Sequence, residues 1–320
     1  MPPRTKCPAV PIIIEMIRRL NVHNRAAFYL FLIFGLLFFS NASAKSRNLN
    51  PEKYILAFSP RTGQALIYYL ASQMNSEGQS FLGINIGLSA NTSGEIDFAV
   101  RSVSPESVFV ALSSPGILVF LKTLDAQNRF TLSAPEDHPV EVIFGKTGRI
   151  REVRNIEALE KQNLMNFSVL DVLQNCLPTF PDKQVSINDS WQDHKRMLIP
   201  FQGMNLILDL DIIFLLNDVL PSPEGRTALI QANYTVTLSG SRKIEELMGS
   251  FEGKGSGSGN LIFLMDQGYF TRYGLNYSLN GSMIMRNAEK DLMKWPFSLT
   301  FNADLILMEK RKAQPRRAER

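Results

Sequence analysis

Hydrophobic and polar residues alternate at every second position through much of the chain. In the last such stretch, 295–307, apolar side chains run from Trp295 to Leu307, with Ser298 and Thr300 among the polar residues between them. This period is typical of a β-strand with one buried face and one solvated face. The pattern recurs in residues 82–88, 96–101, 206–214, 228–238 and 269–279. Strands of this kind favour antiparallel sheets rather than buried parallel ones.

A helical pattern interrupts the strands near the middle of the chain. Ser168 can cap a helix over residues 167–177, in which the apolar side chains fall at helical spacing. Pro178 and Pro181 would end that helix. A weaker, charged helix is expected over about residues 154–163. The apolar positions of the main helix are Val169, Leu170, Val172, Leu173, Cys176 and Leu177.

The predicted fold is therefore mainly β, with antiparallel sheets forming two half-barrel-like β halves and a short helical segment between them. The expected regions are a signal peptide (1–44), an N-terminal β half (45–152), the helical segment (153–182), a C-terminal β half (183–309) and a basic disordered tail (310–320). Two hairpin-like stretches, 142–150 and 262–270, share one pattern of apolar triplet, glycine turn and new strand. They indicate either related halves or two ordinary hairpins.

Residues 16–44 have the three parts of a secretory signal. Arg18, Arg19 and Arg25 are basic, residues 26–39 are apolar and uncharged, and Ala42-Ser43-Ala44 offers a cleavage site. An uncleaved anchor is the alternative, although 14 apolar residues are few for a spanning helix, which needs about 20. Met16 is a possible true start. No cysteine follows the apolar run, so we expect a periplasmic or extracellular protein without a lipid anchor on cysteine.

Charge and composition exclude several classes of function. The chain has 34 basic and 30 acidic side chains, and residues 1–44 hold five and one of these, which leaves 29 of each in residues 45–320. A neutral mature protein whose basic residues gather in the tail has no reason to bind nucleic acid. Its one remaining cysteine, Cys176, and two histidines, His138 and His194, leave little for metal or nucleophilic chemistry.

Two further patterns are candidate sites. Asp209 and Asp211 share a strand face, but their apolar neighbours favour a solvated face over a metal site. The stretch 253–259, with glycine at every second position, matches neither a phosphate-binding loop nor a nucleophile motif. It is either a flexible loop or, if extended, a bare trough between Phe251 and Phe263 that is open to a helix or a ligand chain. We expect no catalytic residue, no cofactor and no metal.

The residues Leu177-Pro178-Thr179-Phe180-Pro181, followed by Asn188-Asp189-Ser190-Trp191, resemble a pattern in bacterial exported β-rich families of unknown function. In those families a leucine-proline helix end precedes a valine-rich strand and a Gly-Asp-Ser-Trp turn; Asn188 stands here in place of that glycine. The predicted layout of sheet and covering helix is also similar to periplasmic lipoprotein-carrier half-barrels. That likeness implies an acyl chain held between sheet and helix.

The sequence therefore favours a non-enzymatic envelope protein that binds a lipid or other apolar ligand between sheet and helix. The residues expected to line that ligand are Val169, Val172, Leu173, Leu177, Phe251 and Phe263. One alternative is a structural or protein-interaction component of the envelope with no small ligand. A further alternative is an outer-membrane β-barrel, which the helical segment and the basic C-terminal end oppose.

Overall fold

A computed structural model describes residues 52–78, 87–123, 127–156, 177–201, 204–244, 247–287 and 290–312. All the regular elements of these residues are strands. The strands are β1 Gln64–Gly78, β2 Leu88–Val103, β3 Ser107–Thr123, β4 Gln127–Ala134, β5 Val140–Gly145, β6 Ile150–Arg154, β7 Ser190–Phe201, β8 Met204–Ser222, β9 Gly225–Ile244, β10 Leu247–Leu264, β11 Tyr269–Arg286 and β12 Asp291–Lys312.

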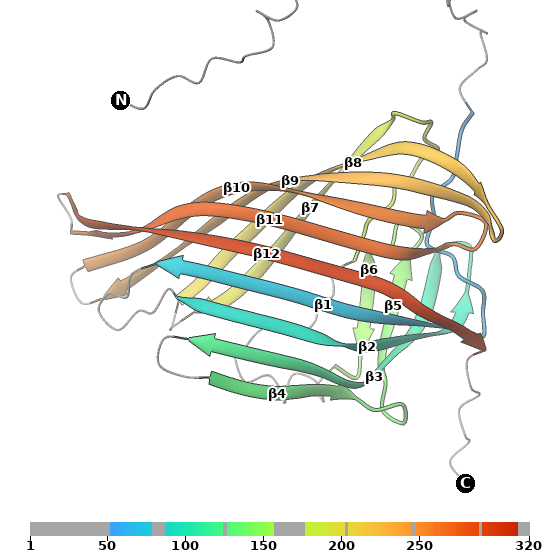
Figure 1. Cartoon of the computed structure of the whole chain (residues 1–320), viewed down its shortest axis with the longest axis horizontal. Coiled ribbons are helices and arrows are strands. Elements are labelled where there is room, and N and C mark those ends of the chain that lie inside the picture. Colours follow the sequence, from blue (N-terminus) through green and yellow to red (C-terminus); the bar gives the residue numbers. More distant parts are fainter. Residues whose placement is uncertain are drawn as a thin grey trace, which may run out of the picture. The chain divides into compact units, whose positions relative to one another are not determined.

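These strands form one open 12-stranded sheet in the order β6-β5-β3-β2-β1-β12-β11-β10-β9-β8-β7, with β4 paired to β3. Neighbouring strands are antiparallel, which confirms the predicted mainly β, antiparallel fold. The two predicted β halves are the two wings of this single sheet. They are joined where β1 pairs with β12 along the whole of β1, and Figure 1 shows the two strands running side by side.

The predicted alternation sets the two faces of the sheet. In β9, Ile230, Tyr234 and Val236 are buried, whereas Asn233 and Thr235 between them are exposed. The same alternation continues from strand to strand, because each antiparallel register places buried residues opposite buried residues. We call the face that carries the buried apolar residues the inner face and the opposite one the outer face.

Two segments without strands, 52–63 and 177–189, pack over the inner face at one end of the sheet. Tyr54 and Val185 join them through a β-bridge. The backbone N–H of Phe58 donates to Lys146 O at 2.9 Å, and that of Phe180 donates to Thr147 O at 2.8 Å. We call this end, which holds Gln64 and Leu264, the capped end. The other end, at which the β11–β12 hairpin turns, is the distal end; it lies on the left of Figure 1.

Both hairpins that the sequence predicted are present, one between β5 and β6 and one between β10 and β11. Each turn has a glycine in the left-handed region at the matching position, Gly148 with φ 78° and Gly268 with φ 71°. Glycine adopts this conformation at no steric cost, because it has no Cβ. A Cβ on either glycine would also overlap a backbone oxygen of the capping segments, that of Pro178 or of Ser59. The two glycines therefore let the turns pack tightly beneath the cap.

In the described parts of the predicted helical segment 153–182, which are 153–156 and 177–182, no helix is seen. Its first two residues belong to β6, because Val153 pairs with Val142 and packs against the core. Residues 177–182 are irregular, as expected where Pro178 and Pro181 remove backbone donors. Within the described ranges, no helix is long and apolar enough to span a membrane.

Several predictions concern residues outside the described ranges. These are the signal peptide (1–44) with its possible start at Met16, most of the strand pattern 82–88, most of the two predicted helices (154–163 and 167–177), and the end of the tail (313–320). The first residues of the predicted tail do belong to the sheet. Lys310, Arg311 and Lys312 continue β12 and pair with the beginning of β1.

Candidate functional site

Apolar side chains on the inner face form rows that run across the strands. One row follows Leu121 on β3, Ala90 on β2, Met74 on β1, Phe301 on β12 and Tyr277 on β11, each directly opposite the next in the register. Since neighbouring strands lie about 4.8 Å apart, a row of five strands is about 19 Å long. This row is apolar throughout, whereas the next row toward the capped end includes the polar residues Thr92 and Ser72.

At the capped end this surface is packed. Phe58 and Phe144 meet edge to face at 5.2 Å between centroids, and Phe180 lies 4.4 Å from Phe263. A cavity of about 10 Å³ remains there, which is the space of a single water molecule. Its lining residues are Phe58, Phe98, Phe144, Gly148, Leu177, Pro178, Phe180 and Phe270. This cavity has no room for an acyl chain.

Toward the distal end, part of the same face is only half buried. The half-buried side chains lie on the five adjacent strands β12, β1, β2, β3 and β4, in positions that continue the buried rows. We call them the distal strip: Met74, Leu88, Ala90, Ile117, Val119, Phe130, Leu132, Trp295, Leu299 and Phe301. An apolar surface that is partly exposed on a folded protein is the usual mark of a binding site.

The ligand-lining residues expected from the sequence are distributed differently. Leu177, Phe251 and Phe263 are all buried in the core. Phe263 contacts Phe180 at the capped end, whereas Phe251 contacts Phe297 at 5.7 Å toward the distal end. Phe263 follows Phe251 by 12 positions on β10, which separates the two by about 40 Å. The other three, Val169, Val172 and Leu173, lie outside the described residues.

The glycine-rich stretch is a strand and not a loop. Residues 253–259 lie within β10 and pair on both sides with β9 and β11. A Cβ on Gly255 or Gly257 would overlap the backbone oxygens of Ser278 or Asn276 on β11. The glycines therefore allow β11 to approach β10 closely, which is how glycines permit sharp curvature in a sheet. The space above them is filled by the neighbouring strand, so they do not form an open trough.

Two charged side chains interrupt the apolar inner face on β7, and the sequence analysis did not single them out. The Asp193 carboxylate, 3% exposed, accepts hydrogen bonds from Arg149 Nη2 at 2.5 Å and Thr179 Oγ1 at 2.6 Å. The Lys195 ammonium donates to Leu177 O. We call Asp193, Arg149 and Thr179 the Asp193 latch. It links β7, one edge of the sheet, to the β5–β6 turn at the other edge.

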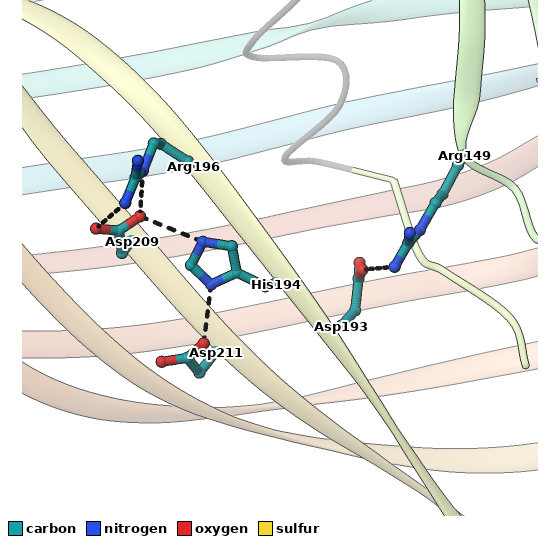
Figure 2. Close-up of polar contacts among 6 residues, drawn as sticks. All are labelled: Arg149, Asp193, His194, Arg196, Asp209 and Asp211. Atoms are coloured by element: carbon teal, nitrogen blue, oxygen red, sulfur yellow. Dashed lines mark hydrogen bonds and ion pairs between the residues drawn. The ribbon is translucent and has the colours of Figure 1, made fainter.

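A second polar cluster lies on the outer face of β7 and β8. Figure 2 shows His194 between two carboxylates, with Nδ1 2.9 Å from Asp211 Oδ1 and Nε2 3.4 Å from Asp209 Oδ1. Arg196 also binds Asp209, with Nε 2.7 Å from Oδ1. The sequence predicted a solvated face for both aspartates, and they lie with His194 on this outer face. Among the described residues, no group of three or more His, Cys, Asp or Glu side chains could hold a metal ion.

Tyrosine hydroxyls on the inner face form hydrogen bonds with one another or with backbone groups. Tyr234 and Tyr273 have hydroxyl oxygens 2.7 Å apart, and the Tyr68 hydroxyl donates to Phe270 O at 2.8 Å. Burial raises the pKa of Tyr68 well above its usual range, so this phenol remains a neutral donor. These hydrogen bonds join β9 to β11 and β1 to β11.

No family model matches the chain, and no curated protein matches its sequence. Among solved structures, the chain is similar to lipovitellin, reported for its lipid–protein interactions, with 10% identity, a TM-score of 0.42, and coverage of 81% of this chain and 26% of that one. It is also similar to an exported protein with a YmcC-like fold from Bacteroides fragilis (8% identity, TM-score 0.25, 80% and 99% coverage).

A third similar structure is an outer membrane channel from Pseudomonas putida F1, with 8% identity, a TM-score of 0.20, and coverage of 78% of this chain and 98% of that one. The chain thus spans 26% of the length of lipovitellin and nearly all of the other two. All three TM-scores are low, and these likenesses support no functional inference.

Proposed function

We propose that this is an exported, non-catalytic envelope protein that holds an apolar chain, such as the acyl chain of a lipid, against the distal strip. The observation that supports this most directly is the contrast within one face of the sheet. The inner face is mostly apolar and is tightly packed at the capped end, whereas the apolar side chains of the distal strip are only half buried. The ligand site of this proposal lies there, away from the packed residues around Leu177 and Phe263.

The size and chemistry of the distal strip suit an unbranched apolar chain. Its side chains are all hydrocarbon, indole or thioether groups, and the row through Met74 and Phe301 is about 19 Å long. Burying one methylene contributes about 0.8 kcal/mol, so ten methylenes contribute about 8 kcal/mol before the costs of association. No specific polar contact is needed for useful affinity, which suits a protein that binds a class of chains rather than one molecule.

The outer face opposes the outer-membrane alternative. On β9 and β11 it presents exposed polar side chains, among them Asn233, Thr235, Asn276, Ser278 and Asn280. A barrel that spans the outer membrane requires an apolar band on its lipid-facing side. The sheet has the reverse polarity, with its apolar side chains inside, so it suits an aqueous compartment. The signal-like residues 16–44 support export to such a compartment.

The test compares two glutamate substitutions at adjacent positions of β1. Met74 lies in the distal strip between Ala90 and Phe301, whereas Gln73 is exposed on the outer face. The protein is purified from the exported fraction without detergent, and native mass spectrometry measures co-purifying lipid. We expect lipid on the parent and on Gln73→Glu, and about a tenfold loss on Met74→Glu, because a carboxylate in the strip must be desolvated by a bound chain.

Circular dichroism and the thermal midpoint show whether both variants fold alike. A parent that carries no lipid after gentle purification, and takes up none from added fatty acid, would favour the structural or protein-interaction alternative. Equal lipid retention by Met74→Glu and the parent would show that the bound chain lies elsewhere than in the distal strip.

A further inference from the structure

Two hydroxyl side chains, Ser72 on β1 and Thr92 on β2, interrupt the apolar inner face beside the distal strip. They lie directly opposite each other in the antiparallel register, and both are half buried. Directly opposed side chains on one face of a sheet have Cβ atoms about 4.5–5.5 Å apart. One small polar group of a ligand can therefore reach both hydroxyls. We call Ser72 and Thr92 the hydroxyl pair.

The hydroxyl pair lies at the border between the packed and the half-buried parts of the inner face. On the side of the capped end, Leu70 and Ile96 of the same two strands are buried. On the side of the distal end, the next inward residues are Met74 and Ala90 of the distal strip, which again lie opposite each other. A chain that covers Met74 and Ala90 and extends toward the capped end therefore meets the hydroxyl pair before it reaches the buried core.

Other hydroxyls on the inner face have partners within the protein. The Tyr68 hydroxyl donates to Phe270 O, and Ser76 Oγ accepts from the backbone N–H of Leu88 at 3.1 Å. Within the described residues, neither member of the hydroxyl pair makes a side-chain hydrogen bond. Each hydroxyl thus has a donor and an acceptor function that water satisfies while this part of the face is uncovered.

The surroundings of the hydroxyl pair on the inner face are uncharged. Its inward neighbours in the register are Leu70, Met74, Ala90, Gly94, Val119 and Ala303. An anion that is taken out of water needs a cation beside it, and none of these neighbours supplies one. The hydroxyl pair therefore suits an uncharged acceptor, such as the carbonyl oxygen of an ester, better than a carboxylate or a phosphate.

A purely hydrocarbon chain laid over the hydroxyl pair would remove water from both hydroxyls and leave them unpaired, which is unfavourable. A ligand that brings an acceptor to this place avoids that cost. We propose that the hydroxyl pair binds the ester group of an acyl lipid, whose carbonyl oxygen accepts hydrogen bonds from Ser72 Oγ and Thr92 Oγ1 while the hydrocarbon tail lies on the distal strip. This rests on the proposed function, which it narrows from apolar chains in general to uncharged acyl esters.

The experiment measures the affinity of the exported protein for three probes by equilibrium dialysis against cyclodextrin complexes. Methyl palmitate carries the ester, hexadecane carries no polar group, and palmitate carries a carboxylate. The variant Ser72→Ala/Thr92→Val removes both hydroxyls and keeps the face apolar. We expect it to bind methyl palmitate about tenfold more weakly than the parent, because the hydrogen bonds to the carbonyl oxygen are lost. Its affinity for hexadecane should be equal to that of the parent or higher.

Ser93→Ala/Thr131→Val is the matched control, because it makes the same two changes on the outer face, where both residues lie in the row of Leu118. It should bind all three probes like the parent. Circular dichroism and the thermal midpoint show whether the variants fold alike. Thr92→Val alone, which keeps the shape of the side chain, should show part of the loss for methyl palmitate and provides a second test if the double variant does not fold.

The three probes separate this proposal from the proposed function. If the parent binds hexadecane and methyl palmitate, but loss of the hydroxyls changes neither affinity or lowers both equally, the apolar site stands and the ester site is wrong. A larger loss for palmitate than for methyl palmitate would show that the hydroxyl pair binds a carboxylate and would also overturn the proposal. A parent that binds none of the probes would remove the proposed function together with the ester site.

Discussion

The Asp193 latch gives the most specific prediction about stability. Asp193→Asn keeps the size of the side chain but removes its charge; its amide oxygen can still accept from Arg149, and its NH₂ group then faces Thr179, whose hydroxyl must turn to accept. Both hydrogen bonds therefore lose the charged acceptor and are weakened. Because the latch links β7 to the β5–β6 turn and to segment 177–189, the effect should appear at both edges of the sheet.

The expected magnitude follows from the burial of the two partners. A hydrogen bond to a charged group contributes about 1.5–3 kcal/mol. Thr179 is buried and contributes fully, whereas the Arg149 side chain is 62% exposed and regains water when the bond is lost. We therefore expect a loss of about 3 kcal/mol in the free energy of unfolding. For a protein of this size, that corresponds to a fall of about 6–12 °C in the thermal midpoint.

Denaturant unfolding and hydrogen exchange measure this change. Asp211→Asn is the control, because the Asp211 carboxylate also lies at hydrogen-bond distance from a neighbour, His194, but is 68% exposed on the outer face. Asp211→Asn should lower the free energy of unfolding by less than about 1 kcal/mol. Faster exchange in residues 177–189 should accompany Asp193→Asn alone. If the two variants lose the same stability, the latch does not hold the capped end together.

Two further predictions concern the glycine-rich strand and the turns at the capped end. Gly257→Ala should lower the free energy of unfolding by more than about 3 kcal/mol or prevent folding, because its Cβ would overlap Asn276 O. Ser256 points outward, so Ser256→Ala should change the free energy of unfolding by less than about 0.5 kcal/mol. The hydrogen bond from Arg226 lowers the pKa of Asp266 in the folded protein. The pair therefore stabilises the fold at pH values above the pKa of this carboxyl in the unfolded chain, and the stabilisation is lost as the pH falls through its lower pKa in the folded protein. Asp266→Asn should thus reduce stability at neutral pH and flatten its decline below about pH 4; an unchanged acid profile would contradict this.

Strands with one solvated face were predictable from the sequence, whereas strands with apolar residues on both faces were not. The alternation in 228–238, 269–279 and 295–307 matches β9, β11 and β12. In β1, Ile67 on the outer face is apolar and buried, as are its neighbours Leu66 and Tyr68, so the sequence there shows no alternation of apolar and polar residues. β3 contains a similar apolar run, 117–121. Periodicity fails wherever a strand is covered on both sides.

The apolar face was predictable from the sequence, but the part of it that is only half buried was not. The expectation of an apolar face came from alternation, and the distal strip lies on that face. However, burial along a strand depends on which segments pack over it, and segments 52–63 and 177–189 have no periodic pattern. β7 was missed for another reason: Asp193 and Lys195 occupy inward positions, where charge hides the alternation of Trp191 and Met197. Their partners, Arg149 and Leu177 O, come from distant parts of the chain.

The glycines of β10 show how a local propensity can be overridden. Glycine disfavours strands, and a loop was the simplest expectation for 253–259. Pairing with β9 and β11 along the full length of β10 outweighs that preference. The close approach of β11 also leaves no room for any other residue at Gly255 or Gly257. A period-two glycine pattern inside a β-rich chain therefore indicates a curved strand rather than a flexible linker.

Photo-crosslinking with a fatty acid that carries a diazirine at its end tests the central claim most directly. After irradiation of the exported protein, peptide mass spectrometry locates the adducts. We predict adducts on the distal strip, in peptides of β1, β2 and β12 that contain Met74, Ala90 and Phe301, and competition by unlabelled fatty acid. Adducts confined to the capped end around Leu177 and Phe180 or to the outer face, or an absence of competition, would contradict the proposed binding of an apolar chain at the distal strip.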